Sequence, residues 1–372
     1  MNNLKILGLD IGGANTKAAL ILCDKFKIKK SISYMEYFPI WEKKLEDIPQ
    51  MLERIIKKLI IQNNFKLEEV DFISITITAE LSDAFQTKRE GIEIIIENLS
   101  KVFKKEKMLF INSDAEFVNI ENAKENYLTI AGSNWASTAL FLGNFVEHCI
   151  LIDAGSTTID LIPITNSKPV SLGKTDIERL INHELIYSGG LRATIPSITH
   201  SVPYKNEVVR ISFEKFALIS DIHRILNNIS EEEYINDTAD NRSKSIDNCY
   251  ARLARIICMD IETVTKEELK KIAYFIYQKQ LDIIESEISI FMELLISRLP
   301  QFKINPLLII TGLAADFLIK KTLIKLGFDN IQYFETVTNT SDKISSSALA
   351  VAGALFYKLK NEINHGNQSS DL

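Results

Sequence analysis

The stretch ILGLDIGGANTKAAL, residues 6–20, consists of two apolar segments joined by the small-residue turn GGANT. This spacing predicts two strands, 4–11 and 17–23, that pair as a hairpin. The glycines permit a tight turn and allow another group to approach the backbone closely. The chain therefore opens with a hairpin whose turn is suited to holding a ligand.

A second stretch, CILIDAGSTTIDLIPI at 149–164, repeats this pattern. The two align without a gap, so that Asp10 falls on Asp153 and Gly12 falls on Gly155. Two copies roughly 140 residues apart indicate an internally duplicated fold rather than a chance turn.

The first hairpin carries groups that suit a phosphate. Backbone N–H groups, a hydroxyl and a lysine can turn toward an anion, and these come from Gly12, Gly13, Asn15, Thr16 and Lys17. Asp10 would repel that phosphate unless a divalent cation lay between them, so the hairpin predicts a Mg²⁺ ion with retained waters.

The second hairpin offers a matching set of polar groups. These are the backbone and hydroxyls of Gly155, Ser156, Thr157 and Thr158, with the carboxylates of Asp153 and Asp160. Two facing cradles would hold a diphosphate or a nucleotide polyphosphate, with Asp10 and Asp153 as metal ligands. The alternative is a pair of glycine-rich hairpins with a purely structural role.

The rest of the chain predicts an alternating α/β organisation. The apolar periodicity indicates helices at 47–63 and 91–105, strands at 70–78 and 107–112, a mainly helical region at 174–300 with a loop-like stretch at 194–212, a strand and helix start at 306–318, and a closing helix at 345–359. We expect an N-terminal lobe over 1–145, a C-terminal lobe over 146–360 with the helical region as a subdomain, and a disordered tail over 361–372.

Composition excludes several classes of function. The 372 residues carry a formal net charge of −6, so the field of the whole molecule would repel nucleic acid. We find neither a targeting segment nor an apolar run long enough to span a membrane. The four cysteines are scattered without a CxxC pair, which is typical of a reducing compartment, and we expect a cytoplasmic protein.

The segment GKTDIERLINHELIYSGGLRAT at 173–194 is unusually polar. Its candidate site residues are His183, Tyr187 and Arg192, of which Arg192 beside the glycine turn is best placed to bind an anion. The alternative is an amphipathic helix with a solvated face, because Asp176, Arg179 and His183 share a side at helical spacing.

The paired hairpins resemble the phosphate loops of the actin, Hsp70 and sugar-kinase superfamily. ITITAELSDAF at 75–85 and the helix at 345–359 resemble that superfamily's two connecting segments, and IITGLAADFL at 309–318 resembles its adenosine-side turn. The resemblance implies a duplicated actin-like (ribonuclease H-like) α/β fold with two lobes around a cleft. The adenosine-side turn usually has paired glycines, whereas this chain has only Gly312, so ATP stays an open alternative as ligand.

Further motifs narrow the resemblance. SNWAST, TDIERLINHELIYSGGLRAT and ARLARIICMD, in this order with the two hairpins, resemble the hydantoinase/oxoprolinase-like family linked to methanofuran and tetrahydromethanopterin one-carbon metabolism. The resemblance implies an aryl-alkyl ether bond formed between a furanmethanol diphosphate and the phenol of γ-glutamyltyramine, with loss of pyrophosphate. Glu80, Trp135, Tyr187 and Arg192 are then candidate substrate contacts.

A base near the phenol would assist this reaction, and Asp153, Asp160 and His183 are the candidates. We expect small-molecule substrates and leave a homo-oligomer open. An ATP-dependent kinase or amidohydrolase is an alternative function on the same fold, and a nucleotide-dependent assembly or regulatory protein is another.

Overall fold

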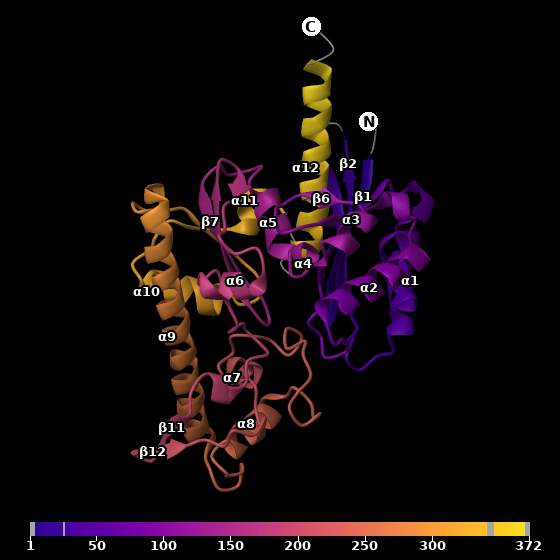
Figure 1. Ribbon diagram of the computed structural model, residues 1–372. Helices are drawn as coiled ribbons and strands as arrows, with labels where there is room; N and C mark the ends of the chain where they lie inside the picture. The colour runs from indigo at the N-terminus through magenta and orange to yellow at the C-terminus, as the bar shows by residue number, and fades with distance from the viewer. Residues whose placement is uncertain (1–3, 25–26, 341–345, 369–372) are drawn as a thin grey trace. The chain divides into compact units, whose positions relative to one another are not determined.

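The computed structural model describes residues 4–24, 27–340 and 346–368 (Figure 1). Contacts divide the chain into two compact units. Unit 1 comprises Met1–Cys149, Ile162–Arg179 and Phe334–Leu372, and unit 2 comprises Ile150–Leu161 and Leu180–Tyr333. The lobe boundaries expected from the sequence, including the break at 145, stay a prediction.

Unit 1 is built on a mixed sheet with the strand order β3-β2-β1-β4-β5-β6. The strands are β1 Leu4–Gly12, β2 Asn15–Cys23, β3 Ile28–Tyr37, β4 Phe72–Thr78, β5 Met108–Ile111 and β6 Phe117–Val118. β1 pairs antiparallel with β2, as predicted for the opening hairpin, and parallel with β4.

The second sheet repeats this order as β10-β8-β7-β13-β14, with β9 paired to β8. Its strands are β7 Cys149–Ala154, β8 Ile159–Thr165, β9 Lys168–Pro169, β10 Leu185–Ile186, β13 Leu308–Thr311 and β14 Ile331–Tyr333. The boundary between the units passes through β8. β7 takes the place of β1 and pairs parallel with β13, so the predicted duplicated α/β fold is confirmed.

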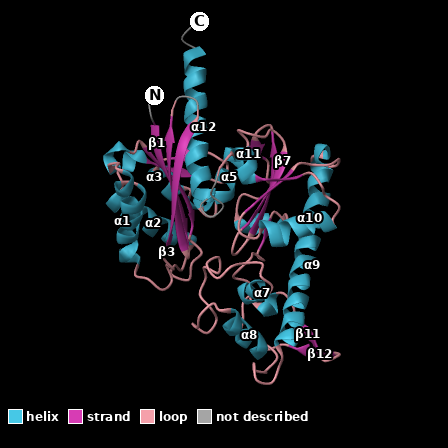
Figure 2. Ribbon diagram, turned by 180° about the vertical axis from the view of Figure 1, so that it is seen from behind, coloured by secondary structure: helices cyan, strands magenta, loops and turns pink. Residues whose placement is uncertain are grey.

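Helices cover both faces of the first sheet, as Figures 1 and 2 show. The helices α1 Ile48–Leu59 and α2 Lys88–Val102 share one apolar core with alternate residues of β1. The long helix α12, Ser346–Gln368, packs on the other face. The remaining helices of unit 1 are α3 Ile120–Glu125, α4 Tyr127–Ile130, α5 Asn134–Leu142 and α11 Phe334–Thr338, and α6 Asp176–Ile181 crosses the boundary.

The contact between α12 and β1 is close because Gly8 has no side chain. A Cβ atom at Gly8 would lie 2.0 Å from the carbonyl oxygen of Ala348 and 2.9 Å from the Cβ of Ala352. Successive side chains of a strand point to opposite faces, so Gly8 and Asp10 both face α12. α12 also runs past the predicted end at 359, through the start of the predicted tail, whose residues 369–372 lie outside the described part.

Unit 2 adds helices around the second sheet. They are α7 Ile219–Ile225, α8 Ile246–Arg255, α9 Lys266–Arg298 and α10 Lys321–Lys325. α9 begins at a capping box, in which Thr265 and Glu268 satisfy each other's backbone N–H groups. The apolar faces of α7, α8 and α9 join the core beneath β7 and β13.

One element of unit 2 differs from the prediction. The stretch 194–212, expected to be a loop, contains the hairpin of β11 Ser201–Tyr204 and β12 Glu207–Arg210. Pro203 lies within β11, where this two-stranded ribbon leaves one strand edge unpaired. Proline is compatible with such an edge position, so its presence was a poor reason to exclude a strand.

We predict that Gly8→Ala destabilises unit 1, because the new methyl group must displace the α12 backbone at Ala348. Overpacking of this kind typically costs about 1–3 kcal/mol. The matched control is Gly13→Ala, whose Cβ would find its nearest neighbour 3.7 Å away. Urea unfolding should give a lower midpoint for Gly8→Ala than for the control, and equal midpoints would contradict the prediction.

Candidate functional site

Asp10 lies at the carboxyl end of β1 and is 4% exposed. The hydroxyl of Ser347, in the first turn of α12, donates to its Oδ2 at 2.5 Å, and the hydroxyl of Thr78 donates to its Oδ1 at 3.3 Å. The ammonium of Lys17, opposite Asp10 on β2, lies 3.9 Å from the same Oδ2. The structure therefore brings the predicted carboxylate and lysine together and orients the carboxylate from two other elements.

The turn of the first hairpin is tight at Gly12, where a Cβ atom would lie 2.6 Å from the carbonyl oxygen of Asn15. Gly13 has room for a side chain, and Thr16 is buried. The side-chain oxygen of Asn15 and the hydroxyl of Thr76, the β4 residue in register with Asp10, are buried without a hydrogen-bond partner among the described residues. Buried polar atoms of this kind mark a place where a polar ligand or water can bind.

Glu80 is a buried carboxylate close to this hairpin. It is 3% exposed, and its Oε2 has no hydrogen-bond partner among the described residues. Burial is the main cause that raises its pKa to about 7, and the charges of Asp176 and Asp10 add to the rise. Its own backbone N–H and Lys88, which is paired with Asp176 at 3.5 Å, act in the opposite direction.

Trp135 lies in α5 and is 3% exposed. The guanidinium of Arg179 stacks over its ring, 4.5 Å from the ring centroid, and Arg179 is itself 1% exposed. In this arrangement the indole is part of the interior of unit 1. Its role as a substrate contact stays a prediction.

In unit 2 the second hairpin is closed by a neighbouring segment. Within the turn, the N–H of Gly155 donates to the carbonyl of Thr158 at 2.9 Å. Four successive backbone N–H groups, those of Gly189, Gly190, Leu191 and Arg192, donate to the turn's carbonyls at 155–157 over 2.9–3.1 Å. These bonds use the carbonyl groups of the turn and not the N–H groups of 156–158 on which the predicted anion binding depends.

Gly189 is required for this closure. A Cβ atom there would lie 2.6–2.7 Å from the backbone of Ser156 and Thr157. The side chain of Arg192 is exposed beyond the contact. The structure thus brings the predicted glycine turn and Arg192 to the second hairpin.

Asp153 ends β7 in the position that Asp10 has in β1, in register with Thr311 of the parallel strand β13. Thr311 is followed by Gly312, with φ +90°, where a Cβ atom would lie 2.8 Å from Asp153 Oδ1 and 2.4 Å from the carbonyl oxygen of Ala154. A glycine is needed here both for its conformation and for space. Asp160 lies farther along β8, 7% exposed and opposite Leu185.

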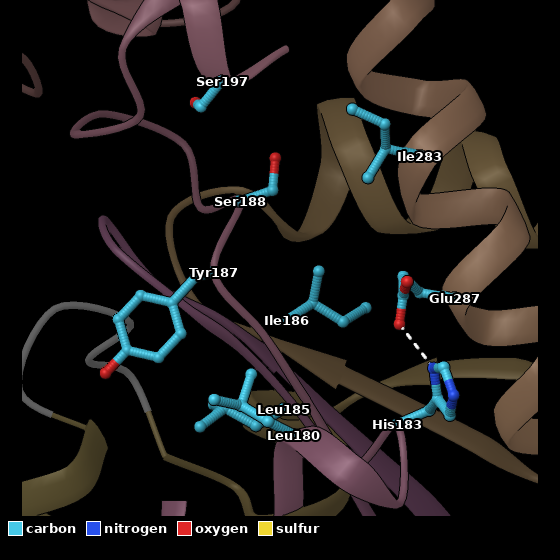
Figure 3. A pocket seen from close by; sticks show the side chains of 9 residues that line it. All are labelled: Leu180, His183, Leu185, Ile186, Tyr187, Ser188, Ser197, Ile283 and Glu287. Atoms are coloured by element: carbon cyan, nitrogen blue, oxygen red, sulfur yellow. Dashed lines mark hydrogen bonds and ion pairs between the residues drawn. The ribbon is translucent and has the colours of Figure 1, made fainter. Parts of the chain in front are cut away.

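His183 and Tyr187 line a pocket of unit 2 (Figure 3). His183 Nδ1 lies 2.7 Å from Glu287 Oε2 on α9. Sequence reasoning identified this histidine but not Glu287, which is one of many charged residues on a long helix. It also missed Ser347, because a serine before an alanine-rich helix gives no signal that distinguishes it from a capping residue.

Two structural observations bear on the other classes of function. Among residues 4–24, 27–340 and 346–368, no cluster of three or more histidine, cysteine or acidic side chains could bind a metal ion by itself. A search of the same residues finds no helix with the length and apolar character that crossing a membrane requires.

Comparison with known proteins places the chain among named enzymes. It is 38% identical over 316 residues to the (4-{4-[2-(γ-L-glutamylamino)ethyl]phenoxymethyl}furan-2-yl)methanamine synthase of Methanocaldococcus jannaschii, covering 85% of this chain and 88% of that one. It is 37% identical over 141 residues to the synthase of the same name from Methanococcus vannielii, covering 38% of this chain and 63% of that one.

Among solved structures, the activator of the 2-hydroxyisocaproyl-CoA dehydratase from Clostridium difficile aligns over 98% of each chain, at 10% identity and a TM-score of 0.47. The family model for hydantoinase/oxoprolinase matches residues 71–356, which include the second hairpin, the glycine turn, the His183 pocket and the start of α12. The chain therefore belongs to the hydantoinase/oxoprolinase family.

Proposed function

We propose that this protein is a synthase of methanofuran-type cofactor biosynthesis. In the proposed reaction, a furanmethanol diphosphate condenses with the phenol of γ-glutamyltyramine to form an aryl-alkyl ether and pyrophosphate. The observation that carries the proposal is the 38% identity, over most of both chains, to a synthase whose named product contains a phenoxymethyl furan.

The chemistry of that product sets what the site must do. The ether joins a phenol oxygen to a carbon attached to a furan ring, and such a carbon ionises readily because the ring spreads the developing positive charge. The enzyme then chiefly has to stabilise the departing pyrophosphate, which fixed N–H groups and a nearby cation do well. The first hairpin, with Lys17 beside its turn, has these groups.

The carboxylates suit a Mg²⁺ ion that accompanies the diphosphate. Mg²⁺ in such sites is held by one or two carboxylates together with phosphate oxygens and waters, so it needs no larger acidic cluster. Asp10 has its oxygens oriented by Ser347 and Thr78, and in the part of the chain that the structure describes, buried oxygens of Asn15 and Thr76 lack a hydrogen-bond partner. In unit 1 Asp10 would hold such an ion, which when bound neutralises the charge of the leaving group; Asp153 is the corresponding carboxylate of unit 2.

Glu80 supports a functional use of unit 1. A buried carboxylate with one oxygen unpartnered among the described residues lowers stability, and such groups are concentrated where a protein binds or transforms a ligand. We propose that Glu80 contacts the substrate, as the sequence suggested.

The reaction is tested with the full chain, Mg²⁺, furanmethanol diphosphate and γ-glutamyltyramine. We expect the coupled ether, identified by mass spectrometry, and one equivalent of pyrophosphate, with or without ATP. Absence of product at saturating substrates would sink the proposal. A strict need for ATP with release of ADP would instead favour the kinase or amidohydrolase alternative.

We predict that Asp10→Asn and Asp153→Asn each lower kcat by about 10²-fold, because each removes a charge that the departing diphosphate and its cation require. The control is Asp247→Asn on α8, which breaks the exposed ion pair with Lys266 and should leave kcat unchanged. Steady-state pyrophosphate release measures all three variants. Near-normal rates for both site variants would remove the metal–diphosphate argument.

The raised pKa of Glu80 predicts that the free energy of unfolding of the protein depends on pH. Its pKa is about 7 in the folded protein against 4.5 as its ordinary value, so the folded state holds the proton more tightly. Stability is therefore lost as the pH rises from 4.5 to 7, by about 3 kcal/mol at most. Glu80→Gln should abolish this loss and stabilise the protein at about pH 8 more than at about pH 5.

Thermal or urea unfolding at the two pH values measures the effect of Glu80→Gln. The exposed Glu125→Gln on α3 is the matched control and should change both curves equally. If Glu80→Gln also shifts stability by the same amount at both pH values, the carboxylate is not the group that loses its proton.

A further inference from the structure

The pocket around His183 is a small cavity of unit 2 with one apolar wall. We call it the His183 pocket; its volume is about 290 Å³, and it is lined by Leu180, His183, Leu185, Ile186, Tyr187, Ser188, Ser197, Ile283 and Glu287. Figure 3 shows the aliphatic side chains of Leu185 and Ile186 between the His183–Glu287 pair and Tyr187, with Ile283 above Glu287. Such a volume is at the small end for ligand sites and suits a single aromatic ring.

One face of α9 joins this pocket to the second hairpin. Gln280, Ile283 and Glu287 follow each other at intervals of three and four residues, so they lie on one side of the helix. The amide of Gln280 donates to the carbonyl oxygens of Ser188 and Gly189, at 3.3 and 3.1 Å. The same helix face therefore holds the glycine turn that closes the hairpin and lines the pocket.

Gln280 is in turn fixed by a buried histidine. Its Oε1 lies 3.0 Å from Nε2 of His223, which is fully buried and stacks 4.5 Å from the ring of Phe317. Burial lowers the pKa of His223 to about 3, so this ring stays neutral and donates its Nε2 proton to Gln280. The pocket and the hairpin are thus linked through buried hydrogen bonds to one face of α9.

Glu287 sets the tautomer of His183. A carboxylate accepts hydrogen bonds, so in a neutral His183 ring the 2.7 Å contact favours the tautomer with the proton on Nδ1, and Nε2 is then the nitrogen that can accept a proton. The backbone of His183 has φ +55°, a conformation that few residues other than glycine and asparagine adopt readily. The neighbouring Glu184 faces Arg298 instead, at 3.6 Å. His183 is the ring that this local structure presents to the pocket.

We propose that the His183 pocket binds the aromatic ring of the phenol acceptor, and that His183, held by Glu287, takes the phenol's proton. The inference rests on the proposed ether-forming reaction. The phenol O–H bond breaks and its proton passes to His183 Nε2, while the oxygen forms a bond to the furan-bearing carbon. The bond from that carbon to the diphosphate breaks, pyrophosphate leaves with the electron pair, and the histidine then releases its proton to solvent.

The main test compares two acceptors. With γ-glutamyltyramine as acceptor, His183→Asn should lower kcat by about 10²-fold, because it removes a general base. With a ring-fluorinated γ-glutamyltyramine whose phenol is already ionised, the same variant should lose less than about tenfold, because no base is needed. A merely structural role of His183 would lower both rates equally, and that result would overturn the proposal.

Glu287→Gln tests the positioning role. We expect a loss of about tenfold in kcat that the fluorinated acceptor again reduces, since the amide can no longer enforce the tautomer. The matched control is Glu285→Gln, two residues away on α9, where the carboxylate pairs with Lys325 and does not line the pocket. Asparagine tolerates the backbone at 183, and thermal unfolding checks that each variant is folded.

Binding measurements separate this inference from the proposed function. Calorimetric titration should show that Ile283→Trp, whose larger side chain fills the pocket, lowers the affinity for tyramine. The affinity for inorganic pyrophosphate with Mg²⁺ should be unchanged. If the protein binds pyrophosphate but Ile283→Trp does not change the affinity for tyramine, the pocket assignment is overturned while the proposed synthase function still stands. Asp10→Asn should weaken the binding of pyrophosphate and leave the binding of tyramine unchanged, because Asp10 belongs to the proposed diphosphate site and does not line the His183 pocket.

Discussion

The four backbone hydrogen bonds from 189–192 to the turn at 155–157 are the interaction on which the rest of unit 2 depends. They take up the carbonyl groups of the turn, and they fix a segment that begins at the wall of the His183 pocket and ends at Arg192. The side-chain amide of Gln280 binds the same segment from α9, so the segment is held by the backbone of the hairpin on one side and by a buried side chain on the other.

Asp10 and Glu80 are buried carboxylates of unit 1 with opposite surroundings. Asp10 accepts hydrogen bonds from the hydroxyls of Ser347 and Thr78 and lies near Lys17, whereas Glu80 has an oxygen without a partner among the residues that the structure describes and a pKa raised to about 7. Environments that differ this much between neighbouring acids usually assign them different roles. One suits a permanent charge at a phosphate, and the other suits a group whose charge changes when a ligand binds.

Much of the fold could be predicted because it depends on patterns of residues that are close together in the sequence. The two strand–turn–strand segments, aligned at Asp10 and Asp153, predicted the duplication. This was possible because apolar alternation and glycine spacing are patterns of residues that are neighbours in the sequence. The hairpin at 201–210 was missed because Pro203 was taken as a sign of a loop, and the sequence alone does not show that its strand lies at the edge of a sheet. Glu287, Gln280 and Ser347 could not be found, because each acts on a residue some 90 or more positions away that only the folded chain brings near.

The close packing of α12 at Gly8 has a consequence for how this sequence can change. Ala348, whose carbonyl oxygen fills the space above Gly8, directly follows Ser347, which holds Asp10. A side chain at position 8 would move that turn of α12, and the hydroxyl would leave the carboxylate with it. Residue 8 has no side chain with which to contact a ligand, yet the orientation of Asp10 depends on its being a glycine, because packing and chemistry share one turn of α12.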